Sequence, residues 1–117
     1  MKKIICFDLD NVICRTKENN YEFSRPIKKS INLINRLYKK GYQIKIFTAR
    51  GMGTYNSNYS LAVKNYQYLT KKQLKKWKVK HHKLIFGKPA YDYFIDDKAY
   101  GFNKNWQSNF LKNLKKL

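Results

Sequence analysis

Short apolar segments alternate with helix-like segments along this chain, and most of them end in a polar or acidic residue. Four segments share this short, apolar character: Lys3 to Asp8, Gln43 to Thr48, Leu84 to Phe86, and Tyr93 to Asp96. Runs of this kind predict buried strands of a parallel sheet, with helices in between. Ligands bind beyond the carboxyl ends of such strands. We therefore expect a functional site where Asp8, Thr48 and Asp96 end their strands.

The stretch between the first two predicted strands divides into a hairpin and a helix. Residues 12–23 contain two short β-prone pieces, which are typical of a hairpin. Pro26 suits the first turn of the helix that follows, Ser24 its N-cap, and Gly41 its end. The helix itself is indicated by apolar residues at helical spacing: Ile27, Ile31, Ile34, Leu37 and Tyr38.

Two more helices are predicted further along the chain. One covers Leu61 to Lys78, with a break near Thr70 where a capping-box pattern begins. The other closes the fold over residues 106–117, because Trp106, Phe110 and further apolar residues share one face. Gly51 to Ser60 is rich in glycine and asparagine and predicts a loop. With 117 residues and no linker or repeat, the chain is expected to form one α/β domain, residues 1–117.

The net charge of +19 raises the question of a nucleic-acid partner. Lysine supplies 22 of the 26 cations, and the lysines are spread over the whole chain. Twelve asparagines accompany them, which is typical of an AT-rich genome. Nucleic acid is therefore an alternative and not the leading partner. A positive field would nevertheless steer any anionic substrate toward the site.

Two further properties indicate the compartment. No run of about 18 apolar residues is present, so we expect no membrane span. The apolar start of the chain is interrupted by Asp8 and Asp10 and is too short for a signal peptide. We expect a cytoplasmic protein in which Cys6 and Cys14 are reduced thiols.

Acidic residues are rare, so their positions are informative. Only seven occur, and four form two tight pairs directly after apolar runs: Asp8 with Asp10, and Asp96 with Asp97. Asp8 and Asp10 face the same side while the chain stays extended. Carboxylates this close repel, and Mg²⁺ is a natural remedy because it prefers oxygen ligands. The two pairs predict a Mg²⁺ site, although Asp96-Asp97 would also suit a helix cap.

These positions support phosphoryl transfer. A carboxylate such as Asp8 can attack phosphorus and form an aspartyl-phosphate. Asp10 can protonate the leaving oxygen and then deprotonate the attacking water. Thr48 offers a hydroxyl and the amides that follow it, including that of Ala49, for phosphate oxygens. Lys88, between a glycine and a proline, offers a cation for the transition state. Alternatively, Thr48 is an ordinary strand residue and Lys88 one of many lysines.

Four segments resemble the four ordered motifs of the haloacid-dehalogenase (HAD) superfamily of phosphohydrolases: Phe7-Asp8-Leu9-Asp10-Asn11-Val12, Phe47-Thr48-Ala49-Arg50, Gly87-Lys88-Pro89 and Phe94-Ile95-Asp96-Asp97. The resemblance covers residues 3 to about 100. It implies a Rossmann-like three-layer fold with a mainly parallel sheet, Asp8 as the nucleophile and Asp10 as the acid/base. It also implies Mg²⁺ held by Asp8, the Asp10 carbonyl and one of the last two aspartates. Thr48 and Lys88 would bind the phosphoryl group.

Within that superfamily the second acid separates phosphatases from dehalogenases. Dehalogenases lack it, so the presence of Asp10 favours phosphoryl transfer. Asn11 departs from the commoner glycine at its position, which implies a stiffer turn with the same chemistry.

The short intervals between the motifs leave no room for a large cap domain, only for a small hairpin flap. Related capless enzymes act on large substrates or are covered by neighbouring subunits, so a homo-oligomer is compatible with the sequence. The form Phe-Thr-Ala-Arg-Gly most resembles small bacterial phosphatases of capsule polysaccharide biosynthesis, which implies a sugar or polyol phosphate as substrate. Specificity would then depend on the hairpin from Arg15 to Phe23 and the loop from Arg50 to Tyr55. Arg50 is expected to pair with a second anionic group or to lie on the surface.

The leading hypothesis is thus a Mg²⁺-dependent phosphomonoesterase for a small phosphorylated metabolite. The first alternative is a polynucleotide end phosphatase with the same chemistry. The second is a basic binding module without enzymatic activity, which the four intact motifs argue against.

Overall fold

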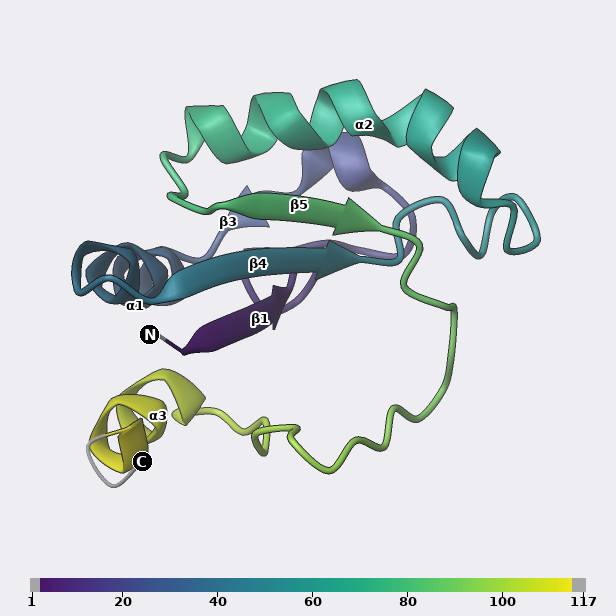
Figure 1. The fold of residues 1–117 in the computed structure, drawn as a ribbon. Helices are drawn as coiled ribbons and strands as arrows, with labels where there is room; N and C mark the ends of the chain where they lie inside the picture. Colours follow the sequence, from purple (N-terminus) through teal and green to yellow (C-terminus); the bar gives the residue numbers. More distant parts are fainter. Residues whose placement is uncertain (1–2, 115–117) are drawn as a thin grey trace.

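A three-stranded parallel sheet forms the centre of the computed structural model, which describes residues 3–114. The strands are β1 (Ile4–Asp8), β4 (Gln43–Thr48) and β5 (Lys83–Phe86). They lie in the order β1-β4-β5, with Asp8 opposite Phe47 and Thr48 opposite Phe86. The carboxyl ends of all three strands therefore meet at one edge of the sheet (Figure 1).

Helices pack around this sheet. Within residues 3–114 they are α1 (Lys28–Lys39), α2 (Tyr59–Lys76) and α3 (Trp106–Leu114). α1 packs against β4 and α3, whereas α2 lies along β5 (Figure 1). None of the helices in this part of the chain combines the length and the apolar character needed to cross a membrane. The expected fold class, a small Rossmann-like α/β fold with a mainly parallel sheet, is confirmed.

The hydrophobic core lies between the sheet and the helices. Along β4 the buried side chains alternate with less buried ones, as the pleat of a strand requires, so Ile44 and Ile46 face inward. Trp106 of α3 closes the core next to Phe7, with 6.3 Å between their ring centroids. Burying a side chain of this size stabilises the fold by about 1.5–3 kcal/mol. The fully buried branched residues include Leu9, Ile13, Ile34, Leu37, Ile44 and Ile46.

The start of the first helix differs from the prediction. Pro26 lies in the short strand β3 (Arg25–Pro26), which pairs antiparallel with β2 (Cys14–Arg15). A proline fits there because an edge strand has positions where no ladder N–H is needed. α1 therefore begins at Lys28, and its N-cap residue is Ile27 and not Ser24. The expected hairpin is present as residues 14–26, which include the 3₁₀ helix η1 (Tyr21–Phe23) and are called the flap below.

The predicted fourth strand at Tyr93 to Asp96 is wrong. No strand follows β5 within the described residues, and the segment is open, with Tyr93 89% and Ile95 95% exposed. Its chain turns instead, because Asp96 Oδ1 accepts a hydrogen bond from the Lys98 amide at 3.0 Å. Such a local Asx turn competes with strand pairing.

The second helix is longer and more regular than expected. α2 runs without interruption from Tyr59 to Lys76, so the predicted break near Thr70 is wrong. The helix is capped at its start by Asn58, whose side chain accepts from the Leu61 amide at 3.1 Å. Thr70 is fully buried and its hydroxyl has a partner outside the helix, described below.

Candidate functional site

The site begins where β1 ends. Asp8 is the last residue of β1, and the chain then turns so that the Leu9 carbonyl accepts from the amide of Ile13 at 2.8 Å. Asn11 completes the turn with φ +67°, a left-handed conformation that asparagine tolerates better than most residues. Its side chain accepts from the Thr16 amide at 3.2 Å and so ties the turn to the flap. A small or turn-forming residue is therefore required at position 11.

Asp8 faces Lys88 across this edge of the sheet. The Lys88 ammonium lies 3.5 Å from Asp8 Oδ1, and its side chain is 8% exposed against 33% for Asp8. Burial raises the pKa of the Asp8 carboxyl, and the charge of Lys88 opposes this only in part. Burial also acts to lower the pKa of Lys88, but hydrogen bonding to Tyr91 and the charge of Asp8 raise it above its ordinary value. Lys88 is thus a fixed cation beside a poorly hydrated carboxylate.

Thr48 ends β4, the strand between β1 and β5, and Ala49 follows it. Thr48 is fully buried, and its carbonyl accepts from the Lys88 amide at 3.1 Å, which places Lys88 against the neighbouring strand. The Thr48 hydroxyl accepts from the Arg50 amide at 3.1 Å and keeps its own proton for donation. The structure therefore brings Asp8, Thr48 and Lys88 together, as the strand ends predict.

Arg50 is held inside the protein by Asp10. Its side chain has no exposed surface, and Asp10 is 21% exposed. The Arg50 Nε lies 3.2 Å from Asp10 Oδ1 and 3.1 Å from Oδ2, and an Nη lies 3.0 Å from Oδ1. Thr16 of the flap also donates to Oδ1, at 2.5 Å. Oδ2 is the less occupied oxygen, since among residues 3–114 it accepts only from Arg50 Nε.

The remaining donors of Arg50 bind two other elements. One Nη donates to Thr70 at 3.1 Å and to Gln73 at 2.6 Å, both on α2. The other lies 3.3 Å from the Ser24 hydroxyl in the flap. The guanidinium also lies over the ring of Tyr21, 5.0 Å from its centroid. Each nitrogen is therefore occupied by a group of the chain itself, and Arg50 joins Asp10, the flap and α2.

This cluster is the feature that sequence reasoning missed. Arg50 is expected above to bind a substrate anion or to lie on the surface, whereas the structure places it inside, away from either role. A signal for this was available in the composition. Lysine provides most of the positive charge, so an arginine two positions after the strand-end threonine suggests a need for the planar five-donor fork.

The second acidic pair is not brought to the first. Asp96 and Asp97 are both exposed in the segment after β5, and within residues 3–114 no group of three or more His, Cys, Asp or Glu side chains is placed to hold a metal. Asp8 and Asp10 supply two carboxylates, and each already faces a cation. As placed, these residues do not make up the expected four-carboxylate Mg²⁺ site.

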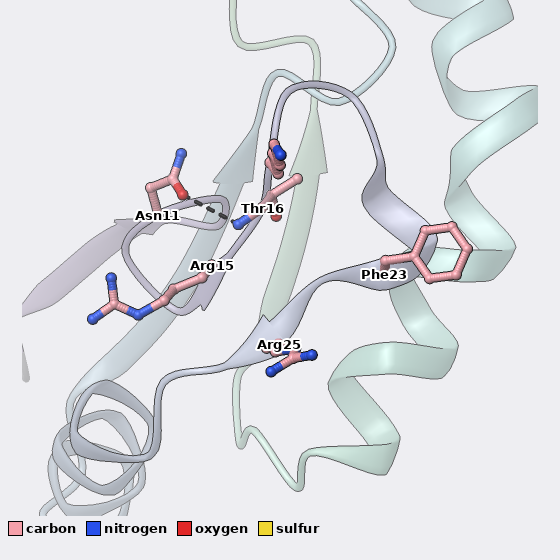
Figure 2. Close-up of a pocket in the computed structure, with 6 residues that line it drawn as sticks. Asn11, Arg15, Thr16, Phe23 and Arg25 are labelled. Atoms are coloured by element: carbon pink, nitrogen blue, oxygen red, sulfur yellow. Dashed lines mark hydrogen bonds between the residues drawn. The ribbon is translucent and has the colours of Figure 1, made fainter.

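A hollow of about 290 Å³ lies on the outer side of the flap (Figure 2). Thr16 lines it and its hydroxyl also donates to Asp10, so this one residue links the hollow to Asp10. Three cations and an aromatic ring take part in its lining, and no acidic residue does. The lining residues are Asn11, Arg15, Thr16, Lys17, Phe23 and Arg25.

Comparisons with known proteins support the fold. No protein-family model matches the sequence, and no curated protein matches it. Among solved structures, a structural-genomics target from Vibrio cholerae is similar, with a TM-score of 0.79, 23% identity, and coverage of 96% of this chain and 98% of that one.

Chains from two structures of the Pnkp1/Rnl/Hen1 complex, one described as an RNA repair complex, are also similar. Their TM-scores are 0.55 and 0.53, at 15% and 16% identity. Each likeness covers 97% of this chain but only 34% or 32% of the larger chain. At these identities the likenesses show a shared fold.

Proposed function

We propose that this protein is a phosphomonoester hydrolase of the HAD type that uses Asp8 as its nucleophile. The observation that carries the proposal is the placement of Asp8 at the end of β1, with the Lys88 ammonium 3.5 Å away and Asp10 fixed beside it by Arg50. A nucleophilic carboxylate, a neighbouring acid/base and a cation for the phosphoryl oxygens are the groups that such a reaction needs. The four motifs in order support the family assignment.

The proposed reaction has two steps. An Asp8 oxygen attacks phosphorus, the bond from phosphorus to the ester oxygen breaks, and Asp10 gives its proton to the leaving alcohol. Asp10 then removes a proton from water, which attacks the aspartyl-phosphate, so that inorganic phosphate leaves and the Asp8 carboxylate is restored. Lys88 and the Thr48 hydroxyl stabilise the charge on the transferring group, with the Ala49 amide as a further donor.

Asp10 Oδ2 is the oxygen suited to carry the proton. Oδ1 is contacted by Cys14, Thr16 and Arg50, whereas Oδ2 accepts only from Arg50 Nε. A carboxyl proton requires a free lone pair, and Oδ2 offers more of them.

We also propose Mg²⁺ as the cofactor and the cytoplasm as the compartment. Asp8 and Asp10 already face Lys88 and Arg50, but an incoming phosphate dianion adds further negative charge, which a divalent cation held by Asp8 would reduce. The support for Mg²⁺ is thus the chemistry of Asp8, Asp10 and the expected substrate.

We propose two candidate classes of substrate, each supported by a different observation. The sequence resemblance favours a sugar or polyol phosphate of capsule biosynthesis. A polynucleotide end is the second candidate, and the cationic hollow on the outer side of the flap favours it. The likeness to chains of an RNA repair complex adds support for that second class.

A panel of phosphate esters tests the proposal. We expect the protein to hydrolyse an aryl phosphate and at least one physiological ester. We also expect EDTA to abolish this activity and added Mg²⁺ to restore it. The panel contains sugar phosphates, polyol phosphates, and 3′- and 5′-phosphorylated oligonucleotides at physiological salt. Absence of turnover throughout would contradict the enzyme and favour a basic binding module.

Asp10→Asn is expected to affect poor leaving groups most. An alkyl alcohol needs a proton to leave, whereas an aryl alcohol leaves readily without one. Acid catalysis contributes about 10²–10⁴-fold, so kcat for an alkyl phosphate falls by that amount. For a nitrophenyl phosphate, the rate of the first step, the transfer of the phosphoryl group to Asp8, is expected to fall less. The factor lost is at least about tenfold smaller than for the alkyl phosphate. Equal losses for both esters in single-turnover measurements would contradict the acid role of Asp10.

A further inference from the structure

The outer side of the flap has an arrangement of charge that costs stability unless an anion is bound. Arg15 and Arg25 are directly opposite each other in the β2–β3 pair. Opposed residues of antiparallel strands lie on the same face, and like charges there are destabilising. Lys17 adds a third cation to the same hollow.

No carboxylate of the described residues neutralises these cations. The ion pairs found in residues 3–114 are Arg50 with Asp10 and Lys88 with Asp8. Glu18 and Glu22 belong to the flap but do not line the hollow and pair with none of its cations. The missing counter-charge is therefore expected to come from a ligand.

The distribution of arginine points to the same place. The chain has four arginines, and three of them, Arg15, Arg25 and Arg50, lie at the flap. Arginine binds phosphate through two parallel N–H donors, which lysine does not offer. In a chain whose positive charge is mostly lysine, two opposed exposed arginines indicate a phosphate group.

Phe23 indicates the kind of phosphate compound. Its ring lines the hollow with 74% of its surface exposed, so it is open to contact with a ligand. Figure 2 shows it at η1, with its ring pointing away from Arg15. An exposed ring beside cations is the arrangement that binds single-stranded nucleic acid, where bases stack on aromatic side chains and cations follow the backbone.

We propose that this hollow binds the phosphodiester next to the terminal phosphate of a single-stranded oligonucleotide, with Arg15 and Arg25 on the diester and Phe23 stacked on a base. The assignment rests on the proposed phosphatase function, and Thr16, which lines the hollow and donates to Asp10, is the residue that links the two. It replaces a small metabolite with a polynucleotide end as the substrate class.

Binding of a product oligonucleotide tests the hollow without requiring turnover. The probe is a fluorescein-labelled pentanucleotide with a free 3′-hydroxyl, measured by anisotropy over a series of salt concentrations. We expect Arg15→Gln and Arg25→Gln each to weaken binding by about three- to tenfold and to lower the salt slope by about one. Phe23→Ala is expected to weaken it by about tenfold.

Two matched controls separate the hollow from the general positive field. Arg36→Gln removes the same charge from the exposed face of α1, and Tyr68→Ala removes a ring that is 79% exposed on α2. Both are expected to bind like the unchanged protein. If Arg36→Gln weakens binding as much as Arg15→Gln, the field of the whole protein binds the oligonucleotide and the assignment is overturned.

Comparing substrates shows whether the hollow binds the phosphodiester of an oligonucleotide or the second phosphate of a sugar bisphosphate. We expect kcat/KM for a 3′-phosphorylated dinucleotide to exceed that for a nucleoside 3′-monophosphate by at least tenfold, and Arg25→Gln to reduce this ratio. A sugar bisphosphate hydrolysed better than the dinucleotide, with no effect of Phe23→Ala, would overturn the nucleic-acid assignment. Specific binding without hydrolysis of any ester would contradict the phosphatase and leave the hollow supported.

Discussion

Asp8→Asn is expected to reduce kcat for every phosphate ester by about 10⁴- to 10⁶-fold, the range seen when a nucleophile is removed. Asparagine has nearly the same shape and still fills the end of β1, but its amide does not attack phosphorus. Steady-state release of inorganic phosphate measures the loss. Asp92→Asn, which makes the same change at an exposed position after β5, is expected to keep full activity.

A covalent intermediate gives an independent measurement for the same residue. The unchanged protein is expected to take up label from a radioactive phosphate ester in an acid-quenched single turnover, and Asp8→Asn to take up none. Activity of Asp8→Asn within tenfold of the unchanged protein would show that another group attacks phosphorus.

Arg50→Ala is expected to lower the free energy of unfolding by about 3–5 kcal/mol, because it leaves a partly buried carboxylate without its partner. The substitution also removes the donors that Thr70, Gln73 and Ser24 now accept from, and these three groups lie on two elements. The total stability of a domain is only about 5–15 kcal/mol, so a large share is lost. Urea denaturation followed by tryptophan fluorescence measures the change.

Three further variants show whether geometry or charge is responsible. Arg50→Lys keeps the charge but lacks the fork, so it is expected to recover only part of the stability. Arg36→Ala, at an exposed position of α1, is expected to cost less than about 0.5 kcal/mol. The double variant with Asp10→Asn is expected to lose less than the sum of the two single losses. A loss below about 1 kcal/mol for Arg50→Ala would contradict the central position given to Arg50.

The parts of the fold that follow from local patterns were predictable from the sequence. The short apolar runs that became β1, β4 and β5 are typical of strands in a parallel sheet, and the helix-like segments between them favour that topology. Once the strands were placed, parallel topology required Asp8 and Thr48 to end at the same edge. Lys88 was singled out instead by its position between a glycine and a proline and by the motif resemblance.

The remainder depends on contacts between distant residues. Arg50 reaches Asp10 and Gln73, separated from it by 40 and 23 positions, and no periodicity connects these residues. Thr70 resembled a helix cap because its local sequence is that of a capping box, but the tertiary hydrogen bond from Arg50 uses its hydroxyl instead. The apolar residues at 93–95 resembled a strand, yet Asp96 finds a local partner in the Lys98 amide.

The flap has two sides with different constraints. Cys14 and Tyr21 are buried against the Arg50 cluster, whereas Arg15, Phe23 and Arg25 are exposed. Because neighbouring side chains of an extended chain point to opposite faces, one side supports the position of Asp10 and the other meets solvent. Substitutions on the outer side can therefore change which molecules are accepted while the reacting groups stay in place. Such a division lets the preference of an enzyme diverge during evolution without loss of its chemistry.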